Sequence, residues 1–175
     1  MADLVGFLSV RYQPEHGFFG GYLIVNQLAR PLEFHCTMPV RPSRSQELLY
    51  GSTLNDFVCG EQIAKALTQK AKLKPEILLT DTPAVLSLEV VSKLAVALVE
   101  SGETSRNDLS VPPTNAELER FKAGSENLCI RKDSQHDKQH TIESLSNLGD
   151  RFDLLEPFQR VVDALLEAHP NVKAA

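Results

Sequence analysis

The sequence predicts an α/β domain built on one mixed β-sheet. Three observations support this class. β-forming segments separated by short turns fill the first forty residues, helical and buried-strand patterns alternate over residues 53–99, and an amphipathic helix lies near the end of the chain. Consecutive strands with short links form an antiparallel meander, whereas strands joined by a helix run parallel. With 175 residues, 42% of them hydrophobic, the chain suffices for one domain with a substantial core.

Three strands are predicted first, over residues 4–12, 20–26 and 32–40. The first segment is rich in β-forming residues and ends at Gln13-Pro14, and the second follows a turn-like stretch at residues 15–17. The third lies between Pro31 and Pro42, and proline is tolerated at the ends of strands but not inside a central one.

A change of period marks the next elements. Thr53 is a plausible N-cap for a helix whose small and apolar positions recur at spacings of three and four: Phe57, Gly60, Ala64, Leu67 and Ala71. Residues 77–81 form an apolar run that ends in a carboxylate, as buried parallel strands often do. Pro83 opens a short helix to residue 88 or 91. Residues 94–99 are interpreted as a last buried strand, although the end of a longer helix fits the same short run.

The remainder divides into two parts. Residues 101–149 are mostly polar and are predicted to be a surface insertion or linker, with a helix over 115–122 and a hairpin over 128–142. Residues 150–175 hold a terminal helix that packs on the mixed-sheet core of residues 1–100. Its apolar stripe consists of Leu155, Phe158, Val162, Leu165 and Leu166.

Charge and cysteine content exclude several classes of protein. A net charge of −5 opposes non-specific attraction to nucleic acid, because counterion release requires clustered lysine and arginine. The three cysteines, Cys36, Cys59 and Cys129, are widely spaced and suggest neither a disulfide framework nor a structural zinc site. The first residues lack a basic signal region, and no apolar run reaches the roughly 18 residues of a membrane span. We therefore expect a cytoplasmic protein with no membrane association.

The order of elements and several short strings resemble ribonuclease H over about the first hundred residues. The strings are Gly20-Gly21-Tyr22 in the second strand, Glu61 early in the first helix, Thr80-Asp81 at the end of the fourth strand, and Asp150 or Asp153 before the last helix. The resemblance implies a ribonuclease H-like fold in which Glu61, Asp81 and a later aspartate bind metal. Two-metal hydrolysis of a phosphodiester needs carboxylates from separate elements to converge on Mg²⁺ or Mn²⁺.

The first strand departs from that family's pattern. It contains no carboxylate where the family places a metal-bridging aspartate, and Arg11 brings positive charge toward the same site. Glu33 on the third strand could substitute only if its side chain faces the same end of the sheet.

The leading hypothesis is therefore a non-catalytic binding or assembly domain, a possible pseudoenzyme, with no cofactor and with a protein partner or a second copy as its ligand. One alternative is a metal-dependent nuclease that uses Asp81, Glu61 and a third carboxylate from Glu33, Asp150 or Asp153. Another is a small-molecule-binding domain whose ligand sits beside residues 81–83, at the carboxyl ends of the central strands.

Other polar groupings have simpler explanations. Arg41, Arg44 and the lysines beginning at Lys65 form the only basic concentration; they fit a solvated helix end and could also contact a phosphate backbone. His136, His140 and Glu143 have the spacing of one helical face, but their polar surroundings favour a solvated loop.

A cysteine and histidine pair on the third strand has an equally simple explanation. His35 and Cys36 are adjacent, so strand alternation points them to opposite faces, and without a β-bulge they cannot both act at one site with Cys59. A structural role for Cys36 is expected.

Overall fold

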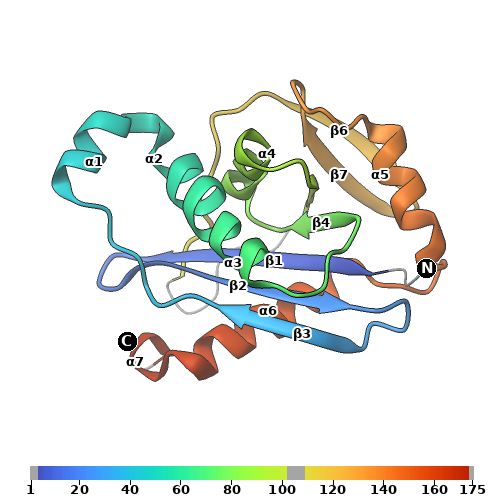
Figure 1. The fold of residues 1–175 in the computed structure, drawn as a ribbon, viewed down its shortest axis with the longest axis horizontal. Coiled ribbons are helices and arrows are strands. Elements are labelled where there is room, and N and C mark those ends of the chain that lie inside the picture. Colours follow the sequence, from blue (N-terminus) through green and yellow to red (C-terminus); the bar gives the residue numbers. More distant parts are fainter. Residues whose placement is uncertain (1–3, 102–108, 174–175) are drawn as a thin grey trace.

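A computed structural model describes residues 4–101 and 109–173. They contain a seven-stranded mixed sheet in the order β3-β2-β1-β4-β5-β7-β6, with helices against both faces (Figure 1). This confirms the mixed α/β class. The strands are β1 (Val5–Gln13), β2 (Gly17–Val25), β3 (Pro31–Cys36), β4 (Ile77–Thr80), β5 (Ala95–Val99), β6 (Leu118–Ala123) and β7 (Glu126–Arg131).

Strands β1 to β3 form the predicted antiparallel meander. The β1–β2 ladder is continuous from Val5↔Val25 to Gln13↔Gly17, so Gly20-Gly21-Tyr22 lies inside β2. Strand β3 ends earlier than the predicted residue 40, because after Thr37 the chain leaves the ladder and rejoins β2 only through an isolated bridge between Val40 and Phe18.

Strands β4 and β5 run parallel to β1, as the alternation of helix and strand indicates. Their registers are Leu8↔Thr80 for β1 and β4, and Thr80↔Leu98 for β4 and β5. The apolar run at residues 94–99 is therefore a strand and not the end of a helix. The carboxyl ends of β1, β4 and β5 meet at one edge of the sheet.

The first helical region starts ten residues earlier than predicted. Ser43 caps it, with its hydroxyl accepting from the Gln46 backbone N–H at 3.1 Å while the Gln46 side chain accepts from the Ser43 backbone N–H at 3.0 Å. Thr53 makes no side-chain cap; its hydroxyl donates to the Tyr50 carbonyl oxygen. The region comprises α1 (Arg44–Tyr50), η1 (Gly51–Thr53), α2 (Leu54–Asp56), η2 (Phe57–Ala64, π-helical) and α3 (Lys65–Lys70).

The predicted helix over 115–122 and hairpin over 128–142 are both wrong. Residues 118–131 form the β6–β7 hairpin, which turns at Gly124 (φ +65°), and β7 pairs with β5 through Leu98↔Cys129. The polar composition concealed a pair of strands because β6 is an edge strand with exposed alternate positions, which leaves little apolar periodicity. Part of the expected insertion thus extends the sheet.

The remaining helices lie on the two faces of the sheet. The predicted short helix after Pro83 is η3 (Pro83–Ser87) with α4 (Leu88–Val91), and the later helices are α5 (Lys138–Leu145), η4 (Ser146–Leu148), α6 (Glu156–Ala168) and α7 (Pro170–Lys173). Four of the five residues in the predicted terminal stripe are buried, and Leu155 is partly buried.

Alternation along the strands divides the core into two layers. In β1, Val5 and Phe7 belong to the layer beneath α6, whereas Leu8 and Val10 belong to the layer beneath η2, α3 and η3. In β4, Leu79 faces α6 and Leu78 faces the opposite layer. The same alternation fixes the face of the sheet on which the next residue of each strand places its side chain.

The contact between η2 and η3 depends on the lack of a side chain at Gly60. A Cβ atom there would lie 2.8 Å from the backbone nitrogen of Leu88 and 3.0 Å from the carbonyl oxygen of Ala84, and it would overlap the Ser87 hydroxyl. We predict that Gly60→Ala lowers the free energy of unfolding by about 1–3 kcal/mol, because backbone atoms cannot move aside as flexible side chains do.

Urea denaturation measures this change. Gln62→Ala, at an exposed position of the same helical stretch, is the control and should alter stability by less than about 0.5 kcal/mol. Equal stability of Gly60→Ala and the wild type would show that the two helical segments can separate without penalty.

Candidate functional site

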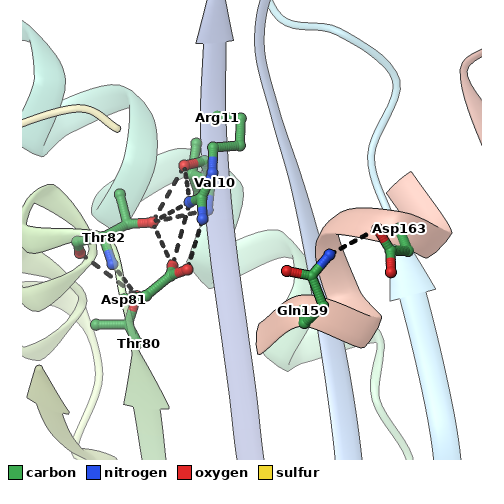
Figure 2. Close-up of polar contacts among 7 residues, drawn as sticks. All are labelled: Val10, Arg11, Thr80, Asp81, Thr82, Gln159 and Asp163. Carbon is green, nitrogen blue, oxygen red and sulfur yellow. Dashed lines mark hydrogen bonds and ion pairs between the residues drawn. The ribbon is translucent and has the colours of Figure 1, made fainter. Parts of the chain in front are cut away.

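A buried ion pair joins the ends of β1 and β4. The Arg11 guanidinium donates to both carboxylate oxygens of Asp81, at 3.2 Å from Nη1 to Oδ1 and 2.6 Å from Nη2 to Oδ2 (Figure 2). The side chains are only 11% and 9% exposed. Such a two-point contact is among the stronger polar interactions available to an arginine.

Thr82 holds this pair in place. Its hydroxyl accepts from the backbone N–H of Val10 at 3.0 Å and lies 3.0 Å from Oδ1 of Asp81 (Figure 2). Nη1 of Arg11 also donates to the Val10 carbonyl oxygen at 3.0 Å. The residue after Asp81 is thus tied to β1, and both carboxylate oxygens have partners within the protein.

Ser9 occupies the position on β1 that is level with Asp81. The β1–β4 ladder ends at Leu8↔Thr80, so the next residues on the two strands are neighbours. Ser9 is fully buried, and its hydroxyl oxygen has no hydrogen-bond partner within the described residues. Its β2 neighbour, Gly21, lies directly beneath α6, where an added Cβ would be 2.9 Å from Val161. The position on β1 that is level with Asp81 therefore carries a small side chain under α6 and no carboxylate.

A cleft opens beside the ion pair, at the carboxyl edge of the sheet. Its volume is about 1280 Å³, and it lies among the end of β5, the β6–β7 hairpin and the start of α6. Arg11 and Asp81 line it, as do Asp150 and Asp153. One oxygen of Asp153 accepts from the backbone N–H groups of Leu155 at 2.9 Å and Glu156 at 3.3 Å, which caps the start of α6.

Glu61 is not part of this cleft. It belongs to η2, which covers the other layer of the core, and its charged neighbours are Asp56 and Arg131. Burial and the nearby Asp56 raise the pKa of Glu61, while Arg131 opposes the shift. The resemblance to ribonuclease H grouped Glu61 with Asp81, whereas the structure places Glu61 beside Asp56 and Arg131.

Glu33 also lies away from Asp81. It is on β3, the third strand from β4 in the sheet. Its carboxylate accepts from the backbone N–H groups of Lys72 at 2.8 Å and Leu73 at 2.9 Å, and it pairs with His35 at 2.6 Å. Glu33 therefore ties the edge strand to the end of α3 and does not replace the missing first-strand carboxylate.

The basic residues singled out in the sequence lie outside the cleft. Arg41 lines a second, smaller cavity and donates to the Pro14 carbonyl oxygen at 3.2 Å. Arg44 is exposed on α1 and pairs with Glu47. Lys65 begins α3, on the opposite layer from α6. The structure does not gather them into one surface beside Asp81.

The histidines and cysteines do not form a reactive or metal-binding group. Among the described residues no cluster of three or more histidine, cysteine or acidic side chains is placed to hold a metal ion. The rings of His136 and His140 are 4.7 Å apart, and His136 also contacts the Lys93 carbonyl oxygen at 2.9 Å. Burial raises the pKa of the Cys59 thiol, and burial with the Glu100 contact raises that of Cys129 to about 12.

Comparison with known proteins gives a likeness in fold alone. No protein-family model matches the sequence, and no curated protein gives a significant match. The mixed α/β fold is nevertheless shared with solved structures. The structure of human ENDOV aligns with a TM-score of 0.54 at 16% identity over 98% of this chain and 86% of that chain.

Two further solved structures align more distantly. Endonuclease V of Ciona intestinalis, in complex with a 23mer DNA containing an inosine followed by a ribo-adenosine, gives a TM-score of 0.48 at 13% identity over 83% of this chain and 77% of that one. Argonaute of Marinitoga piezophila, in complex with 5′ OH guide RNA, gives 0.36 at 9% identity over 83% and 26%. Within the described part of the chain, no helix has the length and apolar character needed to cross a membrane.

The sequence indicates that Arg11 brings positive charge toward the site of Asp81, but it does not predict their direct ion pair or the contacts of Thr82 with both strands. The signal available in the sequence was a threonine directly after a strand-end aspartate. Pairing required the β1–β4 register, because Arg11 and Asp81 are 70 positions apart.

Removal of one partner from the ion pair is predicted to destabilise the protein strongly. Arg11→Met leaves the nine-tenths buried Asp81 carboxylate without its cation and should lower the free energy of unfolding by about 3–5 kcal/mol. The double variant Arg11→Met/Asp81→Leu removes both charges and should recover most of that loss. Urea unfolding of the four members of this cycle gives the coupling, and additive single effects would show that the charges do not interact.

Glu33 is predicted to stabilise the fold only above acidic pH. Its bonds to His35 and to the Leu73 and Lys72 N–H groups lower its pKa from 4.5 to about 2. A lowered carboxyl pKa adds stability that is complete above about pH 4.5 and disappears as the pH falls toward 2. Glu33→Gln should therefore melt at a lower temperature than the wild type at pH 7, with a difference that shrinks below pH 4.5.

Thermal melts from pH 7 to 2.5 follow this difference. Glu15→Gln, in the exposed β1–β2 turn, should match the wild type throughout. A Glu33→Gln deficit that persists unchanged at pH 2.5 would contradict the role of the ionised carboxylate.

Proposed function

We propose that this chain is a non-catalytic binding domain whose ligand occupies the cleft at the carboxyl edge of the sheet. The observation that supports this proposal above all others is the Arg11–Asp81 pair. Asp81 is the strand-end carboxylate that a metal-dependent nuclease of this topology would use, and here an arginine engages both of its oxygens.

The donor set at this position does not fit a two-metal centre. Such a centre needs several carboxylates around two divalent ions that lie roughly 3.5–4 Å apart. Arg11 places a permanent positive charge 2.6 Å from Asp81, and Ser9 supplies a hydroxyl under α6 on the adjacent strand. The acidic residues Glu61 and Glu33 belong to other contacts. Binding without hydrolysis is the function that this arrangement supports best.

A metal-dependent nuclease is the second candidate. Its support is that Asp81, Asp150 and Asp153 all line one cleft, in a fold shared with human ENDOV. For this function Arg11 would have to leave Asp81, and Asp153 would have to release the N–H groups at the start of α6. Both changes would break hydrogen bonds that the folded chain already makes.

Cleavage assays separate the two candidates. We predict that the purified chain leaves labelled single-stranded DNA, duplex DNA, RNA–DNA hybrid and inosine-containing DNA intact with Mg²⁺ or Mn²⁺, because the central carboxylate is neutralised. Cleavage products are resolved on denaturing gels, with the protein in increasing molar excess over the labelled substrate.

The matched variants make a positive result interpretable. Asp81→Asn removes the cleft carboxylate, whereas Asp163→Asn changes an α6 residue that contacts Gln159 and does not line the cleft. Metal-dependent cleavage by the wild type and by Asp163→Asn, lost in Asp81→Asn, would overturn the non-catalytic proposal and establish the nuclease.

A further inference from the structure

The charge of the cleft is unfavourable for an anionic ligand. Among the residues that the structure describes, six carboxylates and three arginines line it. Two of the arginines are already neutralised, Arg11 by Asp81 and Arg120 by Glu100 at 2.7 Å. Glu156 is likewise paired, with Arg160 at 2.6 Å, so Glu126, Asp150 and Asp153 remain against Arg151 among the described lining residues. The field in the cleft is therefore negative and would repel a phosphate backbone.

The start of α6 does not reverse this charge. A helix N-terminus attracts anions through its free N–H groups and its dipole. Here Asp153 accepts from the Leu155 and Glu156 N–H groups, so a negative side chain already occupies that position. The cleft therefore presents acidic side chains even where the backbone would favour an anion.

Apolar side chains line the cleft between these charges. Val111, Leu118, Phe152 and Leu155 are partly buried and contribute to its wall. Lysine and arginine have long aliphatic stems with charged ends, so they can lie along such a wall while their cations reach a carboxylate. The lining thus matches basic side chains in both their apolar and their charged parts.

The size of the cleft indicates a ligand larger than a metabolite. Its volume of about 1280 Å³ exceeds the range of roughly 300–1,000 Å³ that is typical for small-molecule pockets. An extended polypeptide can fill such a space with alternate side chains, whereas a single small molecule would leave much of it to water.

From the cleft's negative charge, apolar wall and volume, we propose that it binds an extended, lysine- and arginine-rich segment of a partner protein. The segment's cations contact Glu126 and Asp150 at the rim, and their stems pack on the wall formed with Leu118 and Phe152. This inference rests on the proposed binding function and adds the chemical class of the ligand.

Fluorescence anisotropy with a labelled peptide tests the inference. The probe is a peptide of about ten residues, roughly 33 Å long when extended, with lysine and arginine interspersed with leucine. We expect saturable binding that weakens as salt is raised, and no binding of the same peptide with glutamate in place of each basic residue.

Charge-reversal variants locate the site. Glu126→Lys/Asp150→Lys should weaken binding by about tenfold or more. Glu15→Lys/Glu76→Lys changes the net charge equally at exposed positions outside the cleft and should bind within twofold of the wild type. Equal weakening by both pairs would assign the effect to overall charge and overturn the site.

Two further outcomes distinguish this inference from the proposed function. If a labelled single-stranded oligonucleotide binds and the basic peptide does not, the ligand class is wrong while a non-catalytic binding domain remains. If the wild type cleaves nucleic acid in the assay above, the proposed function itself fails. Circular dichroism of each variant confirms that losses of binding do not arise from unfolding.

Discussion

The ion pair between Arg11 and Asp81 determines the chemistry available at the carboxyl edge of this sheet. It joins β1 to β4 where these parallel strands end, and Thr82 holds both strand ends in register. A buried ion pair is stable only while each charge keeps its partner. If Asp81 bound another ligand instead, Arg11 would be left buried without a counter-charge. In open α/β sheets ligands bind beside the carboxyl ends of the strands, and in this protein Arg11 engages the carboxylate at that position.

The two-layered core separates the acidic residues that might otherwise act together. Residues of β1 and β4 that face α6 lead to the cleft, whereas those on the other face pack beneath η2, α3 and η3. Glu61 follows the second layer, and Glu33 is engaged by the end of α3. Asp81, Asp150 and Asp153 line the cleft, which lies on the side of the first layer. Of the carboxylates singled out in the sequence, Glu61 and Glu33 thus have separate contacts elsewhere in the fold, and the three aspartates line one cleft.

The likeness to human ENDOV concerns the fold and not the site. At 16% identity the shared topology extends over nearly the whole chain, yet function depends on particular side chains placed on that topology. In this chain the position on β1 level with Asp81 carries Ser9, and Arg11 engages the Asp81 carboxylate. With the excess of carboxylates among the described residues that line the cleft, they are the basis on which we propose a basic polypeptide as the ligand.

The meander, the parallel strands, the short helix after Pro83 and the terminal helix could be predicted from the amino-acid sequence, because these elements have strong apolar periodicity and clear proline boundaries. The lack of a carboxylate in the first strand was visible there too. That residues 118–131 extend the sheet became clear in the folded protein, since an edge hairpin with exposed positions has a weak pattern. The pairing of Arg11 with Asp81, the isolation of Glu61 and Glu33, and the charge of the cleft also required the tertiary structure. The reason is physical: side chains distant in sequence meet only through strand register and the choice of sheet face, and neither is encoded in local spacing.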